Sequence, residues 1–292
     1  DELIDMLQDA EGMQSYSSDR VDEELLQRCP TIRAVCNTAV GYNNIDVDAC
    51  TRRGVMVTNT PGVLDDSVAD YSIGLMIATC RRMGEGERYL RAGEWKTVYL
   101  KQTLGRDVHG ATIGIVGFGR IGQAIAKRAR GFDMNILYHT RNRVAPDVEQ
   151  ALGAQYVSKE ELLAQSDIVM LILPYTPETH HFIGAQELAK MNSSAVLINM
   201  ARGGIVDDAA LIDALRNKTI WAAGLDVYEN EPKLNPGVLE MDNVFLSPHI
   251  ASASESTRRA MAMTAAKNLV AALGGKKPPN LINPDYRNHL KG

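Results

Sequence analysis

The chain has 292 residues, of which 45% are hydrophobic, enough to bury one large core or two smaller ones. Its net charge of −5 gives no general reason to bind nucleic acid or an anionic membrane, and no apolar run approaches the ~20 residues that a transmembrane helix needs. The four cysteines are irregularly spaced, without a C-x-x-C pair or a metal-ligand pattern. We therefore expect reduced core thiols, a cytoplasmic location and no metal site.

The beginning of the chain alternates between strand-like and helical stretches. Apolar residues at helical spacing come first, and short strand-like runs follow with helices between them. We expect the strands at 12–16, 33–36 and 55–58, and the helices at 22–28 and 47–53. Such alternation predicts a parallel sheet with covering helices, and the pattern ends at Asn59 to Pro61.

Residues 65–110 contain a long helix followed by a long polar segment. The helix is expected over residues 65–82, and the residues near one of its faces are Val68, Ser72, Leu75, Met76 and Thr79. The segment Gly84–Gly110 is too long for an ordinary connection and carries Trp95, Tyr99 and Leu104. We expect it to be an arm that packs on a second copy of the chain in a homodimer; a disordered loop is the alternative.

Residues 111–122 predict a buried strand, a tight turn and the start of a helix. Gly117, Gly119 and Gly122 fall on the G-x-G-x-x-G spacing of a dinucleotide site. The first glycine permits the turn, the second lets the backbone approach a pyrophosphate, and the third lets helix and strand pack closely. The N–H groups expected to face the pyrophosphate are those of Arg120, Ile121 and Gly122.

Strands and helices continue to alternate after this turn. We expect six parallel strands in this part, at 112–116, 135–139, 168–173, 195–199, 222–227 and 244–246. Helices are expected at 159–164, 185–190 and 208–217. Six parallel strands after a glycine turn match a complete dinucleotide-binding fold. A last helix, 255–273, is expected to cross back to the first domain with Ala260, Met263, Ala266 and Val270 on one side.

Several motifs then follow in a recognisable order. They are Val40–Asp46, the glycine turn, Leu173–Thr179, Asn199–Gly204, Gly224–Pro232 and Pro248–Ser252. On these motifs the chain resembles the D-isomer-specific 2-hydroxyacid dehydrogenases over nearly its whole length. Within that family it is most similar to the glyoxylate/hydroxypyruvate reductases, including those that also reduce 2-ketogluconate.

The resemblance implies that Arg202, Glu231 and His249 are catalytic. Their chemistry agrees, because an arginine can fork onto the carboxylate and carbonyl of a 2-keto acid, and a histidine ordinarily titrates near neutral pH and can protonate the developing alkoxide. A glutamate on the other ring nitrogen would orient the histidine and favour its protonated form.

Further roles follow from the same resemblance. Val40 and Gly41 match the loop whose backbone N–H groups receive the substrate carboxylate, and Pro174 and Asp226 match positions beside the cofactor. The chain departs from the family at Asn43, where an aspartate is usual, which puts local contacts of that loop in doubt.

The end of the second strand of the dinucleotide fold predicts the cofactor. NAD enzymes usually carry an acidic residue about 20 positions beyond the glycine turn, bonded to the ribose 2′-OH. Here the sequence is His139, Thr140, Arg141, with Arg143 close by and no carboxylate until Asp147. We therefore expect NADPH to be preferred, with NADH possible; two exposed basic residues in a loop are the alternative.

The resulting fold class is α/β, with two doubly wound parallel-sheet domains. A Rossmann dinucleotide-binding domain, residues 65–250, is expected inside a flavodoxin-like substrate domain made of residues 1–64 and 251–292. The family's substrate domain opens with a strand and a helix ahead of this region. We expect that strand to precede residue 1, since without it strand 12–16 lacks a neighbour.

The predicted activity is reduction of glyoxylate, hydroxypyruvate and possibly 2-ketogluconate to D-2-hydroxy acids. One alternative is an NAD-linked D-lactate or phosphoglycerate dehydrogenase, which the basic strand end disfavours. Another is a non-catalytic, nucleotide-sensing corepressor. Formate dehydrogenases share the fold, but they pair the histidine with glutamine where this chain has Glu231.

Overall fold

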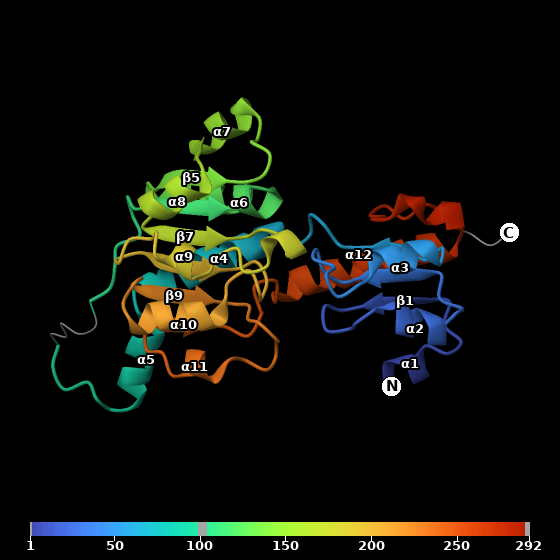
Figure 1. Cartoon of the computed structure of the whole chain (residues 1–292), viewed down its shortest axis with the longest axis horizontal. Coiled ribbons are helices and arrows are strands. Elements are labelled where there is room, and N and C mark those ends of the chain that lie inside the picture. The colour runs from blue at the N-terminus through green and yellow to red at the C-terminus, as the bar shows by residue number, and fades with distance from the viewer. Residues whose placement is uncertain (1, 99–103, 290–292) are drawn as a thin grey trace. The chain divides into compact units, whose positions relative to one another are not determined.

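The computed structural model describes residues 2–98 and 104–289 and divides the chain into two compact units (Figure 1). Unit 1 runs to Leu64 and resumes at Ser252, and unit 2 is Asp65–Ala251. Both units are built from parallel strands and helices, so the fold class is α/β as the sequence predicts. Among the described residues, no helix is both long and apolar enough to pass through a bilayer.

Unit 1 contains a three-stranded parallel sheet in the order β1-β2-β3. Its strands are β1 (Gly12–Ser15), β2 (Ala34–Asn37) and β3 (Met56–Thr58), and its helices are α1 (Glu2–Met6), α2 (Glu23–Arg28), α3 (Val47–Arg52) and α12 (Glu255–Leu273). Within the described residues, β1 pairs on one side only, with β2. The flavodoxin-like order has five strands, of which this sheet supplies three.

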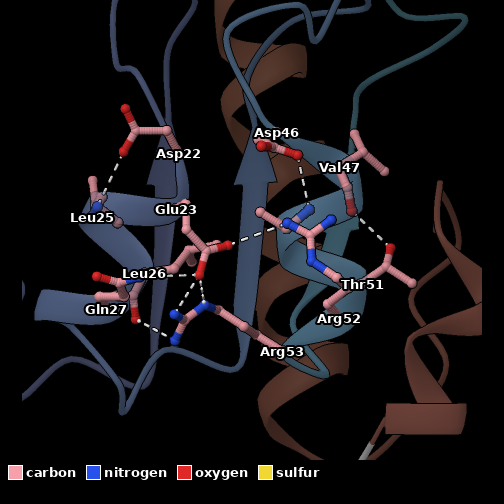
Figure 2. Close-up of polar contacts among 11 residues, drawn as sticks. Asp22, Glu23, Leu25, Leu26, Gln27, Asp46, Val47, Thr51, Arg52 and Arg53 are labelled. Atoms are coloured by element: carbon pink, nitrogen blue, oxygen red, sulfur yellow. Dashed lines mark hydrogen bonds and ion pairs between the residues drawn. The ribbon is translucent and has the colours of Figure 1, made fainter.

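Helices α2 and α3 are stabilised by aspartate caps and by a shared ion-pair cluster (Figure 2). Asp22 accepts a hydrogen bond from the N–H of Leu25 at 3.1 Å, and Asp46 accepts one from Ala49 at 2.8 Å. Each aspartate satisfies an N–H group that has no partner within its own helix. Glu23 binds the guanidinium groups at the end of α3, with 2.9 Å from Nε of Arg53 to its Oε1. These contacts fix the two helices side by side on the sheet.

Helix α12 has the predicted bounds. The side chains buried on it are Thr257, Met261, Ala265, Asn268 and Ala272. Met263 and Val270, two of the residues that share one side of the helix, are 51% and 74% exposed. Alanine and methionine occur all round this helix, so its spacing alone does not identify the buried face. The helix packs on β2 and belongs to unit 1.

Unit 2 is a doubly wound, seven-stranded parallel sheet in the order β10-β9-β8-β7-β4-β5-β6. Its strands are β4 (Thr112–Val116), β5 (Asn135–His139), β6 (Ala154–Tyr156), β7 (Ile168–Leu171), β8 (Val196–Asn199), β9 (Ala222–Leu225) and β10 (Val244–Leu246). The order reverses between β4 and β7, which is the position where such sheets bind dinucleotides. The prediction of six strands missed β6, a three-residue edge strand whose Gln155 is exposed.

Helices cover both faces of this sheet. They are α4 (Asp65–Cys80), α5 (Met83–Arg91), α6 (Arg120–Ala129), α7 (Pro146–Leu152), α8 (Lys159–Gln165), α9 (Ala185–Leu188), α10 (Asp208–Arg216) and α11 (Pro236–Leu239). Strands β7, β8 and β9 are buried throughout, and the core between them and α8 to α10 is almost wholly aliphatic. All five side chains predicted to lie near one face of α4 are buried.

The segment Gly84–Gly110 differs from its prediction in one respect. It begins within helix α5, which we did not expect because its sequence is polar and carries two glycines. The described residues 92–98 then extend away from the sheet of unit 2 (Figure 1). Trp95 is 55% and Leu104 65% exposed, whereas Tyr99 lies outside the described residues.

The cysteine prediction is confirmed. All four thiols are free and buried. Burial raises the pKa of Cys50 and Cys80 to about 12, so these thiols stay protonated and unreactive at neutral pH.

Candidate active site

The glycine turn has the geometry that a pyrophosphate needs. Gly117 has a φ of +95°, and a Cβ there would lie 2.7 Å from the Ile172 carbonyl oxygen. Gly119 is the N-cap residue of α6, and a Cβ there would meet nothing within 4 Å. The first-turn N–H groups, those of Arg120, Ile121 and Gly122, come directly after this open position and lie at the positive end of the helix. The site fits a dinucleotide phosphate.

The end of β5 presents one exposed cation, Arg141. Among the described residues it makes no hydrogen bond or ion pair, although its charge adds to the hydrogen bond from Thr176 in lowering the pKa of Glu178. The Arg143 guanidinium instead grips Glu149 of α7, with two N–O distances of 2.7 Å. Those hydrogen bonds, with one from Tyr138, lower the pKa of Glu149 to about 2.

This arrangement corrects the sequence interpretation at two points. A carboxylate does reach the end of β5, because α7 folds back and brings Glu149 there, and Arg143 neutralises it. Arg143 is therefore engaged, which leaves Arg141 as the cation of this segment. His139 and Thr140, at the strand end, are half-buried, and Nδ1 of His139 lies 3.0 Å from the Val157 carbonyl oxygen.

Glu231 and His249 meet at the carboxyl ends of β9 and β10. Nδ1 of His249 lies 2.7 Å from Oε2 of Glu231, and the two side chains are 34% and 30% exposed. Burial opposes ionisation of Glu231, but the hydrogen bond from His249, the N–H of Tyr228 and the charge of Arg202 outweigh it and lower the pKa of the carboxyl. Glu231 is thus a carboxylate that orients the imidazole through Nδ1, so Nε2 can interact with a substrate.

Arg202 follows β8, the strand next to β9. Its Nη1 donates to the Ala201 carbonyl oxygen at 2.8 Å, and its guanidinium interacts electrostatically with Glu231. Burial lowers the pKa of this guanidinium, but arginine stays charged at any physiological pH. Gly203 allows the close approach that brings the two loops together, since a Cβ there would lie 1.7 Å from the Tyr228 carbonyl oxygen.

The segment that carries His249 is fastened by Asp226. This carboxylate is 1% exposed and accepts hydrogen bonds from the N–H groups of Ile250 and Ala251, each at 3.0 Å, and from Oγ of Ser247 at 2.6 Å. His249 itself has a φ of +54°, which is uncommon for a residue other than glycine. The bonds on both sides of it hold that strained conformation in place.

The predicted substrate loop lies in unit 1. The carbonyl oxygens of Val40 and Gly41 accept hydrogen bonds from Nδ2 of Asn59 and Asn37, at 2.9 and 2.8 Å. Within residues 2–98 and 104–289, the N–H groups of Val40 and Gly41 have no hydrogen-bond partner. Two N–H groups on a braced loop suit a carboxylate. Pro174, in the loop after β7, is exposed, and its carbonyl oxygen accepts a hydrogen bond from Thr179 at 2.9 Å.

Sequence reasoning missed the residues that brace the site. Ser247 also bonds Tyr71 of α4, which is 176 positions away, and Tyr228 accepts a bond from the N–H of Ser247 at 2.9 Å. His181 binds Glu229 across 48 positions. No spacing rule links residues so far apart. The adjacent motifs alone could have drawn attention to Tyr228 and Glu229, which lie inside one of them.

Comparisons with known proteins agree with this geometry. Residues 73–251 match the family described as D-isomer specific 2-hydroxyacid dehydrogenase, NAD binding domain. The glyoxylate reductase of Thermococcus litoralis is 46% identical over 287 residues, which cover 97% of this chain and 86% of the relative.

Two crystal structures are similar throughout. A glyoxylate reductase from Paecilomyes thermophila has a TM-score of 0.87 and 38% identity, covering 96% of this chain and 88% of its own. An NADPH-dependent glyoxylate/hydroxypyruvate reductase from Sinorhizobium meliloti, in complex with NADP and malonate, has a TM-score of 0.88 and 36% identity, covering 96% and 86%.

Proposed function

This chain belongs to the D-isomer-specific 2-hydroxyacid dehydrogenase family, and on that premise we propose that it reduces small 2-keto acids to D-2-hydroxy acids. Glyoxylate and hydroxypyruvate are the first substrates to expect, with 2-ketogluconate as a further one. The observation that carries the proposal is the 2.7 Å hydrogen bond between His249 and Glu231, with the charge of Arg202 beside it.

His249 is the proton donor in this proposal. Reduction of a ketone leaves negative charge on its oxygen, which a protonated imidazole can neutralise as the charge develops. Glu231 occupies Nδ1, so Nε2 is the atom that gives up the proton. A carboxylate in contact with the ring also stabilises the imidazolium, which is the form that donates the proton.

Arg202 binds the keto acid in this proposal. A planar guanidinium can donate one hydrogen bond to the substrate carboxylate and another to the neighbouring carbonyl oxygen, so it fixes the carbonyl for attack and draws electron density from it. In unit 1, the N–H groups of Val40 and Gly41 are the ones we propose for a substrate carboxylate.

The nicotinamide dinucleotide, when bound, supplies the hydride that the carbonyl carbon receives. The glycine turn and the first turn of α6 would hold its pyrophosphate, and Pro174 and Asp226 would contact its nicotinamide end. We propose NADPH as the preferred form, because Arg141 is exposed and makes no hydrogen bond or ion pair among the described residues, and the charge of Glu149 is compensated by Arg143. A free carboxylate at this place would repel a 2′-phosphate by roughly 1–4 kcal/mol.

The quaternary structure and location are also proposals. The exposed apolar side chains of the Gly84–Gly110 segment support a homodimer in which this arm packs on the second copy. Four free, buried thiols support a reducing compartment, hence the cytoplasm.

A substrate panel tests the activity. The purified protein is mixed with NADPH and with glyoxylate, hydroxypyruvate, pyruvate or 2-ketogluconate, and loss of NADPH is followed. We expect the highest kcat/KM for glyoxylate or hydroxypyruvate, and a fall in kcat of roughly 10²–10⁴ in His249→Gln. His289→Gln, a change to an exposed histidine of unit 1, serves as the matched control. Tight NADPH binding without turnover of any acid would instead indicate a nucleotide-sensing corepressor.

A further inference from the structure

His181 is not one of the proposed catalytic residues, but it contacts two of the loops that carry them. Its N–H donates to the Gly204 carbonyl oxygen at 2.7 Å, two residues beyond Arg202. Its Nε2 lies 2.7 Å from Oε1 of Glu229, two residues before Glu231. The loop after β7 is thereby joined to the loops after β8 and β9 through one residue, whose φ of +49° is uncommon for a histidine.

The charges around His181 come from three segments. Asp207, which caps α10, has Oδ2 3.8 Å from Nδ1 of the ring, and His180 stacks on the ring with centroids 3.9 Å apart. Asp208, the first residue of α10, accepts a hydrogen bond from the N–H of Glu229 at 3.2 Å. Glu229 is therefore held twice, by its side chain through His181 and by its backbone through Asp208.

The turn that Glu229 belongs to also carries the carboxylate of the proposed acid. The N–H of Tyr228 donates to Oε1 of Glu231 at 2.8 Å, and Oε2 of Glu231 is the partner of His249. Gly203 packs against the carbonyl group of Tyr228 from the other side. A shift of residues 228–231 would thus move Glu231 away from the imidazole.

We propose that His181 and Glu229 form a positioning pair that holds residues 228–231 so that Glu231 stays bonded to His249. The pair touches none of the three groups assigned to the reaction, so its effect passes through Glu231. The inference rests on the proposed function, because it gives Glu231 and His249 the roles of carboxylate partner and proton donor.

A metal site explains the same residues less well. His180, His181 and Glu229 offer donor atoms within 4.8 Å of one another. A metal ion lies near the plane of each imidazole that binds it, however, and these two rings are stacked at an interplanar angle of 23°. Their lone pairs therefore do not converge on one point, whereas the bond from His181 to Glu229 is already formed.

The test is His181→Asn, assayed with glyoxylate and NADPH across pH. Asparagine tolerates the left-handed backbone but is too short to reach Glu229, so the contact is lost without new strain. We expect kcat to fall about tenfold with little change in KM, since a slightly misplaced acid costs turnover rather than binding. We also expect the alkaline limb of the rate profile to move to lower pH, because imidazolium at His249 loses part of its partner. Arg202, the other charge near Glu231, is unchanged in the variant.

The controls separate positioning from general damage. His180→Asn makes the same change one residue away and should leave the alkaline limb in place. Glu229→Ala should match His181→Asn, and the double variant should be no worse than either, as for residues that act as one unit. A variant that merely folds poorly loses rate at every pH without moving the limb, and that result would overturn the proposal.

A measurement without substrate distinguishes this failure from failure of the proposed function. The imidazole NMR signals of His249, assigned by their loss in His249→Gln, are followed across pH in the wild-type protein and in His181→Asn. An unchanged midpoint sinks the positioning pair even where glyoxylate is turned over. A midpoint moved to lower pH supports the pair even where the wild-type protein reduces no 2-keto acid.

Discussion

Asp208 shows how one buried carboxyl makes stability depend on pH. It is 8% exposed at the start of α10, and burial, with the nearby carboxylates of Glu229 and Asp207, raises its pKa to about 6 from an ordinary 3.8. A raised pKa means that the folded state disfavours the ionised form. The part of the folding free energy that depends on protonated Asp208 is therefore fully present below pH ~4 and is lost as pH rises through about 6.

Asp208→Asn should consequently stabilise the protein at pH 8. The asparagine oxygen can still accept the N–H of Glu229, but it carries no charge to desolvate. A shift of two units corresponds to about 3 kcal/mol, and loss of a favourable charge at the helix start offsets up to ~1 kcal/mol of it. Urea titrations should show a gain of about 2 kcal/mol at pH 8 that vanishes at pH 4. Asp213→Asn, an exposed change on the same helix, is the control. An equal gain at both pH values would contradict the assignment.

Arg141 is the residue on which the cofactor preference is proposed to depend. Arg141→Ser removes the exposed guanidinium at the end of β5 without disturbing the Arg143–Glu149 ion pair. We therefore expect kcat/KM for NADPH to fall about tenfold, while kcat/KM for NADH changes little. Rates measured with both cofactors decide this. Arg216→Ser, which removes an exposed arginine on α10 that faces Glu240, should alter neither value. A tenfold preference of the wild-type protein for NADH would defeat the proposal outright.

Site residues could be predicted from the sequence where they lie in a motif. They could not be predicted where only tertiary packing brings them to the site. Arg202, Glu231 and His249 each lie in a sequence motif, and the structure brings their charges together within unit 2. Glu149 and His181 lie in no such pattern. Their partners are set by where α7 and the loop after β7 return to the sheet, which depends on tertiary packing.

In the glycine turn, Gly119 and Gly122 have different roles, although both belong to the same G-x-G-x-x-G motif. A Cβ at Gly122 would lie 2.3 Å from the Gly117 carbonyl oxygen, whereas a Cβ at Gly119 would meet nothing within 4 Å. One glycine is thus needed for the packing of α6 on β4, and the other leaves room for a ligand.

Gly122→Ala and Gly119→Ala should therefore fail in different ways. The first should cost about 1–3 kcal/mol of stability and lower the thermal midpoint by several degrees, because backbone must move. The second should cost less than ~1 kcal/mol but raise KM for the cofactor at least tenfold, because the new methyl group fills the pyrophosphate's approach. Thermal melts and cofactor titrations on both variants check this. A Gly119→Ala protein with normal cofactor affinity would mean that the dinucleotide binds elsewhere.

Elements were predicted well wherever hydrophobic periodicity is strong. The buried strands of unit 2 and the long helix α4 follow the sequence closely. Strand β6 was missed because it is short and lies at an edge, so it carries little apolar signal. The buried face of α12 could not be predicted, because apolar residues occur on all its sides and contact with β2 decides which of them are buried.

At the scale of the whole chain, unit 1 is closed by residues from its two distant parts. Asn283 is 6% exposed; its Oδ1 accepts the N–H of Val57 at 2.8 Å, and its Nδ2 donates to the Val55 carbonyl oxygen at 2.9 Å. Asn268 of α12 donates to the Asn59 carbonyl oxygen at 3.1 Å. These contacts span more than 200 positions, and no local pattern predicts them. They explain how residues on both sides of the Rossmann domain in the sequence still form one compact unit.

The proposed homodimer makes the last prediction. Among the described residues of this segment, 83–98 and 104, five apolar side chains are at least 55% exposed: Met83, Leu90, Trp95, Val98 and Leu104. So many large apolar groups on one stretch are typical of a surface that a partner covers. Changing Leu90 and Trp95 together to glutamate would place two charges in that contact, at a cost of several kcal/mol.

Light scattering during gel filtration should therefore find the wild-type protein at twice the mass of the chain and the Leu90→Glu, Trp95→Glu variant at the monomer mass. Leu239→Glu changes an equally exposed leucine on α11, outside the arm, and should stay dimeric. Dissociation by the α11 change, or a dimer that survives the double substitution, would place the interface elsewhere. The exposed apolar residues of the arm would then need another explanation, because exposing apolar surface to water is unfavourable.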